Sequence, residues 1–163
     1  MKITFKCATK DDVNLIFQLA EKIWRKHYPD IITNEQIDYM LATMYSSPSL
    51  VKQIEEGQEF TIAYLDEVAV GFISVSEKGA SNYFLHKFYV DVNQHRKGIG
   101  QKIWNHIEKN LKRPYTIELT VNRKNFKAIN FYFKTGFIID RIADFDIGAG
   151  YFMNDFVMKK SVL

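Results

Sequence analysis

The residues whose types and spacing most clearly suggest chemistry lie in one short loop in the middle of the chain. The apolar stretch Tyr83–Val92 runs into His95-Arg96-Lys97-Gly98-Ile99-Gly100, and a helical pattern with an apolar residue every four positions follows at once. Glycines let a backbone approach a bulky anion, and a helix start offers unpaired N–H groups and a positive dipole end. Together with the positive charge of His95, Arg96, Lys97 and Lys102, this unit predicts a pyrophosphate site.

The kind of phosphate ligand is narrowed by the motifs that the loop does not match. A P-loop needs G-x-x-x-x-G-K-[ST], which the chain lacks, and the dinucleotide pattern G-x-G-x-x-G/A fails at Ile103. A third pattern, Q/R-x-x-G-x-G/A, cradles the pyrophosphate of coenzyme A. The run His95–Gly100 resembles that pattern, with histidine in place of glutamine or arginine. On these residues the chain resembles the GNAT superfamily of N-acetyltransferases.

A second motif strengthens this resemblance. The segment Asn125–Phe137 is similar to the family signature N-x-x-A-x-x-[LF]-Y-x-x-x-G-F at every specified position. It predicts a short helix closed by Gly136, with Asn125, Ala128 and Tyr132 on one face. A small residue between two polar ones leaves room for a slender ligand chain. A core-facing helix with a buried tyrosine is the alternative for this motif by itself, and the combination with the loop favours the ligand helix.

The resemblance implies acetyl-CoA as cosubstrate and no metal. It also implies that backbone N–H groups of Phe88–Val90 meet the thioester carbonyl, while the pantetheine arm adds to that strand edge. Tyr132 is expected to protonate the coenzyme A thiolate, since a phenol and an alkyl thiol are close in acidity. The residues expected to bind the cofactor are Phe88, Tyr89, Val90, His95, Arg96, Lys97, Gly98, Ile99, Gly100, Gln101, Asn125 and Tyr132.

The base that deprotonates the amine is a separate question. Family members often carry a glutamate or histidine on the strand before the loop, or use water. His86 occupies such a place, and an imidazole titrates near neutral pH. Glu118 on the next strand and water remain alternatives, as does a purely structural histidine. We predict Tyr132 and His86 as the catalytic residues.

The acceptor site is predicted from the first two helices and the last hairpin, where acceptors enter in this fold. We expect Trp24, Tyr28 and Tyr151 to bind the acceptor. The wider set of candidates also includes His27, Tyr39, Tyr45, Asp144, Asp146 and Asp155. The aspartates could attract a cationic amine such as a polyamine. A small-molecule amine is favoured; a protein or peptide N-acetyltransferase and a non-catalytic acyl-CoA-binding module are the alternatives.

Hydrophobic periodicity predicts an α+β fold. We expect a GNAT-like, mixed and mostly antiparallel sheet of about seven strands flanked by four helices, in the order β-α-α-β-β-β-α-β-α-β-β. Thr9 and Thr33 are predicted to cap the first two helices. The expected strands are Lys2–Cys7, Glu59–Leu65, Val68–Ser76, Ser81–Val92, one that starts after Pro114, Phe137–Ile142 and Tyr151–Met158.

Length and composition agree with one GNAT-like domain over residues 1–163, with 47% hydrophobic residues to fill a core. A net charge of +3 is too small to indicate a nucleic-acid partner. The single cysteine, Cys7, excludes a disulfide framework and is expected to be a small buried residue. With no signal-like or membrane-length segment, we expect a cytoplasmic monomer or homodimer whose partners are acetyl-CoA and an amine.

Overall fold

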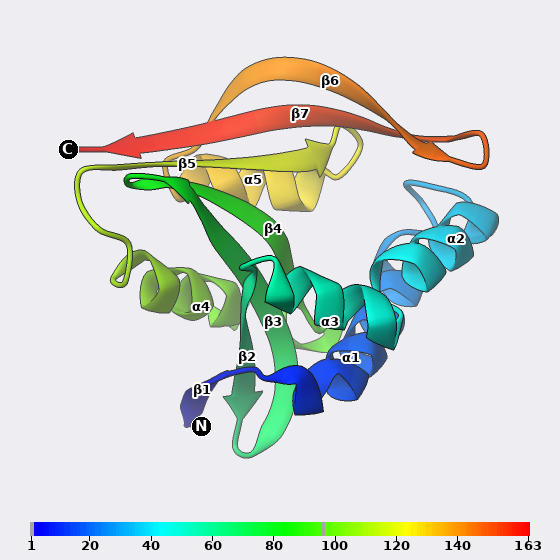
Figure 1. Ribbon diagram of the computed structural model, residues 1–163, viewed down its shortest axis with the longest axis horizontal. Helices are drawn as coiled ribbons and strands as arrows, with labels where there is room; N and C mark the ends of the chain where they lie inside the picture. Colours follow the sequence, from blue (N-terminus) through cyan, green and yellow to red (C-terminus); the bar gives the residue numbers. More distant parts are fainter. Residues whose placement is uncertain (1, 96) are drawn as a thin grey trace. The chain divides into compact units, whose positions relative to one another are not determined.

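The computed structural model describes residues 2–95 and 97–163 and contains a seven-stranded sheet in the order β1-β2-β3-β4-β5-β7-β6 (Figure 1). Strand β4 (Asn82–Val90) pairs in parallel with β5 (Tyr115–Asn122), from Asn82↔Thr116 to Leu85↔Leu119. The pairings of β1 with β2, β2 with β3, β5 with β7 and β6 with β7 are antiparallel. The predicted α+β class and mostly antiparallel sheet are therefore confirmed.

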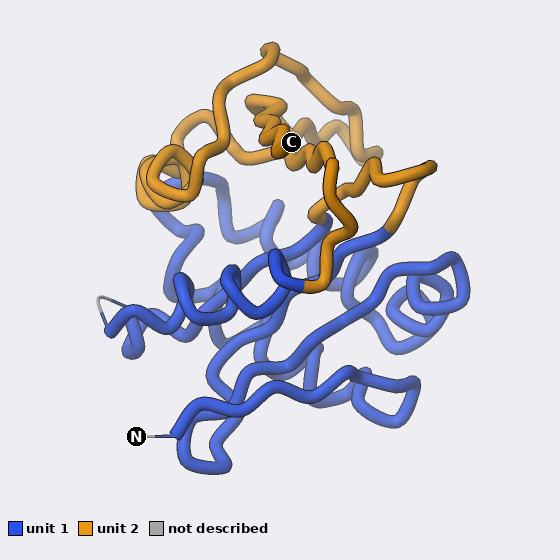
Figure 2. The backbone as a smooth tube through the Cα atoms, turned by 90° about the vertical axis from the view of Figure 1, so that its left-hand side faces the viewer, with its two compact units in different colours: residues 1–76, 86–109 blue, residues 77–85, 110–163 orange. Residues whose placement is uncertain are grey.

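The chain divides into two compact units, coloured separately in Figure 2. Unit 1 comprises Met1–Ser76 and His86–Lys109, and unit 2 comprises Glu77–Leu85 and Asn110–Leu163. The glycine loop and the first helices thus belong to unit 1. The Asn125–Phe137 motif and the last hairpin belong to unit 2. The expectation of one domain over residues 1–163 stays a prediction.

Unit 1 is built on the strands β1 (Ile3–Cys7), β2 (Glu59–Leu65) and β3 (Val68–Gly79) with the second half of β4. Asp66 and Glu67, both with positive φ, form the tight turn between β2 and β3. A Cβ on Gly71 would lie 2.5 Å from the carbonyl oxygen of Tyr89. Only glycine therefore lets β3 and the end of β4 approach this closely.

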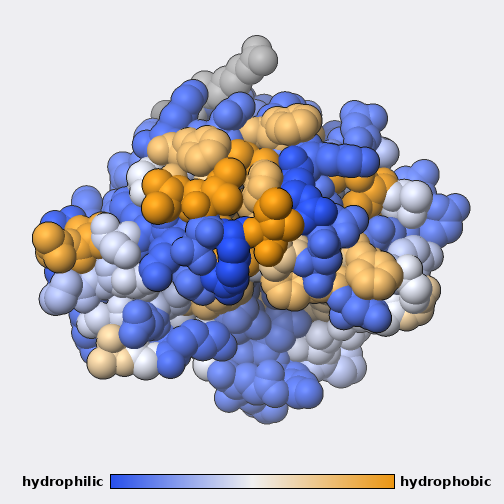
Figure 3. Space-filling model, turned by 90° about the horizontal axis from the view of Figure 1, so that it is seen from above, coloured by the Kyte–Doolittle hydropathy of each residue, from blue (hydrophilic) through white to orange (hydrophobic). Residues whose placement is uncertain are grey.

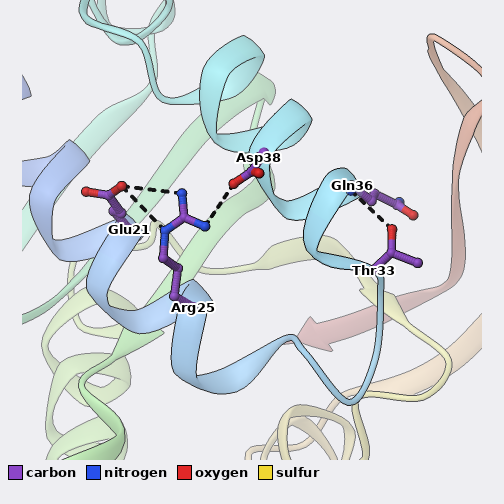
Figure 4. Close-up of polar contacts among 5 residues, drawn as sticks. All are labelled: Glu21, Arg25, Thr33, Gln36 and Asp38. Carbon is purple, nitrogen blue, oxygen red and sulfur yellow. Dashed lines mark hydrogen bonds and ion pairs between the residues drawn. The ribbon is translucent and has the colours of Figure 1, made fainter.

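Two helices of unit 1 are joined by charged side chains (Figure 4). Arg25 of α1 (Val13–His27) contacts Glu21 one turn earlier, and its Nη1 lies 2.8 Å from Asp38 Oδ1 of α2 (Asn34–Met44). Thr33 caps α2 by accepting a hydrogen bond from the Gln36 N–H, as predicted. Thr9 caps a 3₁₀ turn, Lys10–Asp12, that leads into α1. The contact between Arg25 and Asp38 joins the last turn of α1 to α2. Trp24 and Tyr28 lie at this end of α1.

Unit 2 contains β5, α5 (Phe126–Lys134), β6 (Ile138–Gly148) and β7 (Tyr151–Val162). One face of β5 is apolar and buried, through Tyr115, Ile117, Leu119 and Val121. Glu118 and Thr120 alternate with them and are only half-buried. Strand β7 lies between β5 and β6, so its backbone is paired along both edges. Residues 138–142 form only the first part of β6, which continues past the predicted end through an acidic stretch to Gly148.

Two sequence predictions need correction. The structure has five α-helices in its described residues rather than four, because α3 (Ser47–Glu55) was missed. It is short and only Leu50 is fully buried, so its apolar periodicity is too brief to detect. Cys7 is exposed rather than buried. It lies on β1, which is an edge strand and is covered on fewer sides than a central one.

Exposed apolar side chains concentrate on the edge strand β6, at Ile138, Ile139, Ile142 and Phe145. Figure 3 shows hydrophobic residues, in orange, lying among hydrophilic ones on the face toward the viewer. None of the helices formed by residues 2–95 and 97–163 has the length and apolarity needed to cross a membrane.

Helix α4 (Ile99–Glu108) belongs to unit 1 and begins at the glycine loop.

Candidate active site

The predicted phosphate-binding segment starts at Asp91, directly after β4. The Asp91 carboxylate accepts hydrogen bonds from Lys22 Nζ at 2.6 Å and from the Asn93 N–H at 3.0 Å. Burial raises the pKa of Asp91, but these hydrogen bonds and the lysine charge outweigh burial, so its pKa lies below the ordinary value. A short 3₁₀ turn, Val92–Gln94, follows. Asp91 thus ties the start of the loop to α1.

His95, in the position where the family pattern has glutamine or arginine, has a structural contact. Its Nε2 donates a hydrogen bond to the carbonyl oxygen of Val90 at 3.1 Å. The imidazole therefore holds the loop against the end of β4. Lys97 Nζ contacts Gln94 Oε1 at 3.0 Å and remains exposed. Arg96, predicted to bind the cofactor, lies outside the described residues.

Gly98 forms the cap of α4 in a left-handed conformation, with φ +72°. A side chain there would be strained, and a Cβ would have no atom within 4 Å. Ile99, Ile103 and Trp104 are buried and anchor the helix. The first N–H groups of the helix, at Ile99, Gly100 and Gln101, have no partner within the helix itself. The predicted glycines therefore stand at an anchored helix start with open space beside Gly98.

One face of β4 carries an aromatic cluster. The Tyr89 ring lies tilted against Trp24, at 5.6 Å between ring centroids, and its hydroxyl lies 3.4 Å from that of Tyr28. Trp24 also contacts Tyr28 at 4.6 Å and Tyr45 at 5.4 Å. The structure thus brings two of the three predicted acceptor residues together. It adds Tyr45, which is buried, so that its pKa is raised well above 10.0.

Lys87 is a residue of this face that the sequence analysis missed. It shares the face with Tyr89 because strand side chains alternate. Its Nζ lies 5.4 Å from the ring centroid of Tyr45 and 5.7 Å from that of Phe60. Burial lowers the pKa of Lys87 from 10.5 to about 8. The signal in the sequence was a lone lysine in a strand that is rich in aromatic residues.

His86, the predicted base, is half-buried on β4. Its Nε2 lies 2.7 Å from Ser76 Oγ of β3, and either group could be the donor. Phe88 and Val90 are half-buried on the same strand. The ring of His86 is thus held by a neighbouring strand, with one nitrogen already in a hydrogen bond.

In unit 2, the second motif has the predicted local form. Asn125 is the cap of α5, where its side chain accepts a hydrogen bond from the Ala128 N–H at 3.4 Å. Tyr132 is buried, at 7% exposure, with its ring edge-on to Phe131 and Phe137. Gly136 ends the helix with φ +96°. The capping contact shows a structural task for Asn125, which we had predicted to bind the cofactor.

The remaining candidates also lie in unit 2. Tyr151 is half-buried at the start of β7, after a turn of three residues with positive φ. Glu118 has Arg141 Nη1 at 3.9 Å. Asp155 is a buried carboxylate on β7, at 4% exposure. Trp24 and Tyr28 belong to unit 1, so the predicted acceptor residues come from both units.

Comparison with known proteins agrees with the two motifs. A family profile described as "Acetyltransferase (GNAT) domain" matches residues 30–143. This chain belongs to the GNAT acetyltransferase family. A spermidine N(1)-acetyltransferase of Thermoplasma acidophilum is 27% identical, over 98% of each chain. The GNAT resemblance inferred from the loop and the tyrosine helix is therefore confirmed.

Solved structures of other N-acetyltransferases share the fold. The PaiA N-acetyltransferase of Thermoplasma acidophilum, in complex with coenzyme A, superposes with a TM-score of 0.82 at 25% identity, covering 99% of this chain and 100% of that one. The ribosomal-protein-S18-alanine N-acetyltransferase of Escherichia coli has a TM-score of 0.75 at 17% identity, covering 99% and 94%, a likeness of fold. As a GNAT N-acetyltransferase, the protein is an enzyme that uses acetyl-CoA.

Proposed function

We propose that this GNAT enzyme moves the acetyl group of acetyl-CoA directly to a primary amine of a small molecule, with polyamines the first class to test. The observation that carries the cofactor assignment is the left-handed Gly98 at the start of α4, beside open space. Backbone N–H groups at a helix start bind phosphate without a side chain. The pyrophosphate is thus assigned to Gly98–Gln101, with Lys97 and Lys102 adding charge.

Two observations support a small amine acceptor. The 27%-identical relative is named for acetylating spermidine. In unit 1, Trp24, Tyr28 and Tyr89 meet in an aromatic cluster whose tyrosine hydroxyls lie close together. Aromatic faces suit a cationic amine or its alkyl chain, and hydroxyls can orient it. Tyr151 remains a proposed contact of the acceptor.

The proposed chemistry follows the needs of acyl transfer. The thioester carbonyl is polarised by the backbone of Phe88–Val90, as the resemblance implies, and the departing thiolate takes a proton from Tyr132. The amine must also lose a proton. His86 and Glu118 are the groups that the sequence indicates for this step, and water is a third possibility.

The proposal is tested with a panel of acceptors and acetyl-CoA, read by release of free thiol. The panel contains spermidine, shorter diamines, monoamines and peptides with a free N-terminus. We expect the highest kcat/KM with a small amine, and mass spectrometry should show one acetyl group on the product. Higher kcat/KM with the peptides would contradict the small-amine assignment. Tight acetyl-CoA binding without thiol release for any acceptor would favour a non-catalytic binding module.

A further inference from the structure

We propose that Asp155, rather than His86 or Glu118, takes the proton from the acceptor amine. This inference rests on the proposed function, because it assigns a step of the same acetyl transfer. Nothing in the sequence distinguished Asp155 from the other aspartates of the last hairpin. Its position and contacts in unit 2 do.

Asp155 lies on β7, which is paired with β5 along one edge and with β6 along the other. On β7 it stands beside the end of β5. It is opposite Asn122, the last residue of β5, on one side and Ala143 of β6 on the other. Three residues after Asn122, Asn125 begins α5, the helix that carries Tyr132. Asp155 thus lies beside the end of β5 from which the chain leads into α5.

The face that carries Asp155 is polar along β5, whereas its neighbour on β7, Val157, is apolar and buried. Cross-strand partners share a face, so Asp155 lies on the side of Asn122, Thr120 and Glu118. These three residues are only half-buried, whereas the opposite face of β5 is fully buried. Asp155 is therefore a buried carboxylate on a face whose other polar residues are accessible, which is where a polar ligand and a departing proton can be accommodated.

The charged groups around Asp155 leave its carboxylate without an ion pair. Arg123 Nη1 lies 2.8 Å from Asp144 Oδ1 of β6 and also donates to the backbone carbonyl of Asp155 at 3.3 Å. Its guanidinium is thus occupied by another carboxylate and a carbonyl. The Thr120 side chain, on the same face as Asp155, lowers the pKa of this carboxylate. Within residues 2–95 and 97–163, no lysine, arginine or histidine forms an ion pair with this carboxylate.

An unpaired buried carboxylate is a strong candidate for binding a cation or accepting a proton, because burial penalises its charge. Burial raises the pKa of Asp155 to about 6, against the lowering effects of the Thr120 hydrogen bond and the Arg123 charge; Asp144 adds to the rise. An ordinary aspartate is a weaker base. The raised pKa narrows the gap to the ammonium of the acceptor while leaving the group ionised at pH 7.

The proposed step balances as follows. The acceptor ammonium gives one proton to a carboxylate oxygen of Asp155, and the freed nitrogen lone pair forms the bond to the thioester carbon. The carbon–sulfur bond breaks, its electron pair goes to sulfur, and sulfur takes the proton of the Tyr132 hydroxyl. The tyrosinate regains a proton from the new amide nitrogen. Asp155 releases its proton to water, so each turnover yields an amide, coenzyme A and one proton.

The two alternatives already have side-chain partners. One ring nitrogen of His86 is already engaged with Ser76 Oγ at 2.7 Å. Glu118 has the guanidinium of Arg141 at 3.9 Å. Asp155 is the only one of the three with both burial and no cationic partner among the described residues.

The test is the pH dependence of kcat/KM in four proteins. The wild type should lose activity below an apparent pKa near 6. Asp155→Asn should lose that acid limb and fall about 10²- to 10³-fold in kcat, the usual span for one general base. Asp155→Glu should recover part of the activity with the limb retained. The control, Asp140→Asn, removes an exposed carboxylate that pairs with Arg141 and should behave as wild type.

A further variant separates a proton acceptor from a residue that only supports the fold. Thr120→Val removes the hydroxyl that lowers the pKa of Asp155 and keeps the side-chain shape. The acid limb should therefore move to higher pH. Titration of His86 would leave the limb unmoved by this change. Melting temperature and acetyl-CoA affinity, measured for each variant, should stay close to wild type.

The outcomes separate this inference from the proposed function. If the wild type acetylates amines and Asp155→Asn keeps both its acid limb and its rate, Asp155 is not the proton acceptor. If the wild type releases no thiol with any amine, the proposed function fails, and the role of Asp155 fails with it. A lost limb in Asp155→Asn together with a shifted limb in Thr120→Val supports the assignment.

Discussion

His86 on β4 and Ser76 on β3 form a side-chain hydrogen bond, with Nε2 of the imidazole 2.7 Å from the serine hydroxyl. Both residues belong to unit 1, and Ser76 is buried, at 5% exposure. The hydrogen bond orients the ring and occupies one of its two nitrogens. A histidine held in this way has a positioning task whether or not it also moves a proton.

His86→Gln should therefore leave the acid limb of kcat/KM in place and reduce the rate less than tenfold, if Asp155 takes the proton. Glutamine can keep a hydrogen bond to Ser76, so the strands should stay paired. The pH profile of the variant is the measurement, with Ser76→Ala as the matched control for loss of the contact. Disappearance of the acid limb in His86→Gln, with a loss of 10²-fold or more, would return the role of base to His86.

Gly98→Val should weaken acetyl-CoA binding by well over tenfold, about 1.4 kcal/mol or more. The added side chain would enter the open space beside the start of α4, where we assign the pyrophosphate. Calorimetry with acetyl-CoA is the measurement. Gly57→Val is a matched control, because Gly57 also has positive φ, +99°, and no atom within 4 Å of its Cβ.

The Gly57 variant should lose stability through the same backbone strain and keep its affinity. Gly100→Val is expected to behave as Gly98→Val does.

His95→Ala should lower the affinity for acetyl-CoA by about 1 kcal/mol or less, because the His95 ring contacts the Val90 carbonyl and holds the loop. Equal losses for the His95 and Gly98 variants would show that the imidazole is a direct ligand. Unchanged acetyl-CoA affinity in Gly98→Val and Gly100→Val would show that the pyrophosphate does not bind at this loop.

Tyr132→Phe should lower turnover roughly 10- to 10³-fold, the range for loss of one general acid. The ring and its edge-on contacts with Phe131 and Phe137 are kept. Acetyl-CoA affinity should change much less, since the hydroxyl acts as charge develops on sulfur. Single-turnover rates are the measurement, because they isolate the chemical step.

Tyr83→Phe is the control for that experiment. It removes a tyrosine hydroxyl of the same unit that accepts a hydrogen bond from the Lys112 N–H. Its turnover should match the wild type. A Tyr132→Phe enzyme with a wild-type single-turnover rate would exclude the tyrosine as the acid.

Lys87→Met should raise the free energy of unfolding at pH 7 by about 1–3 kcal/mol. Burial lowers the pKa of Lys87 from 10.5 to about 8, so the unfolded chain binds the proton more tightly than the folded one. The resulting penalty is complete below pH 8 and disappears as the pH rises from about 8 toward 10.5. The stability of the wild type should therefore approach that of Lys87→Met over this range.

Urea unfolding at pH 7 and at pH 10 measures this difference. Lys52→Met, which removes an exposed lysine paired with Glu56, serves as the control and should show no such convergence. A difference between wild type and Lys87→Met that is the same at both pH values would mean that the lysine is solvated. The prediction for stability is independent of the catalytic proposals.

Local chemistry explains why the local structure of both motifs could be predicted from the sequence. The left-handed Gly98 and Gly136, the caps at Thr33 and Asn125, and the buried stripe of α4 depend on neighbours within a few residues. Such short-range patterns carry a strong physical signal. The two family motifs are built from them, which is why the GNAT family could be inferred from the chain alone.

Other features depend on residues that meet only in the folded chain. The partners Tyr89, Trp24 and Tyr45 are far apart in sequence, and no periodicity shows that Lys87 lies over the ring of Tyr45. Likewise, Asp155 differs from Asp144 because Arg123 pairs with one carboxylate and leaves the other buried without a cation. Burial and ion pairing are set by packing between strands. The sequence by itself therefore determined the family and the local form of the glycine loop and of the tyrosine helix. Only the tertiary structure decided which charged groups are buried without a partner of opposite charge.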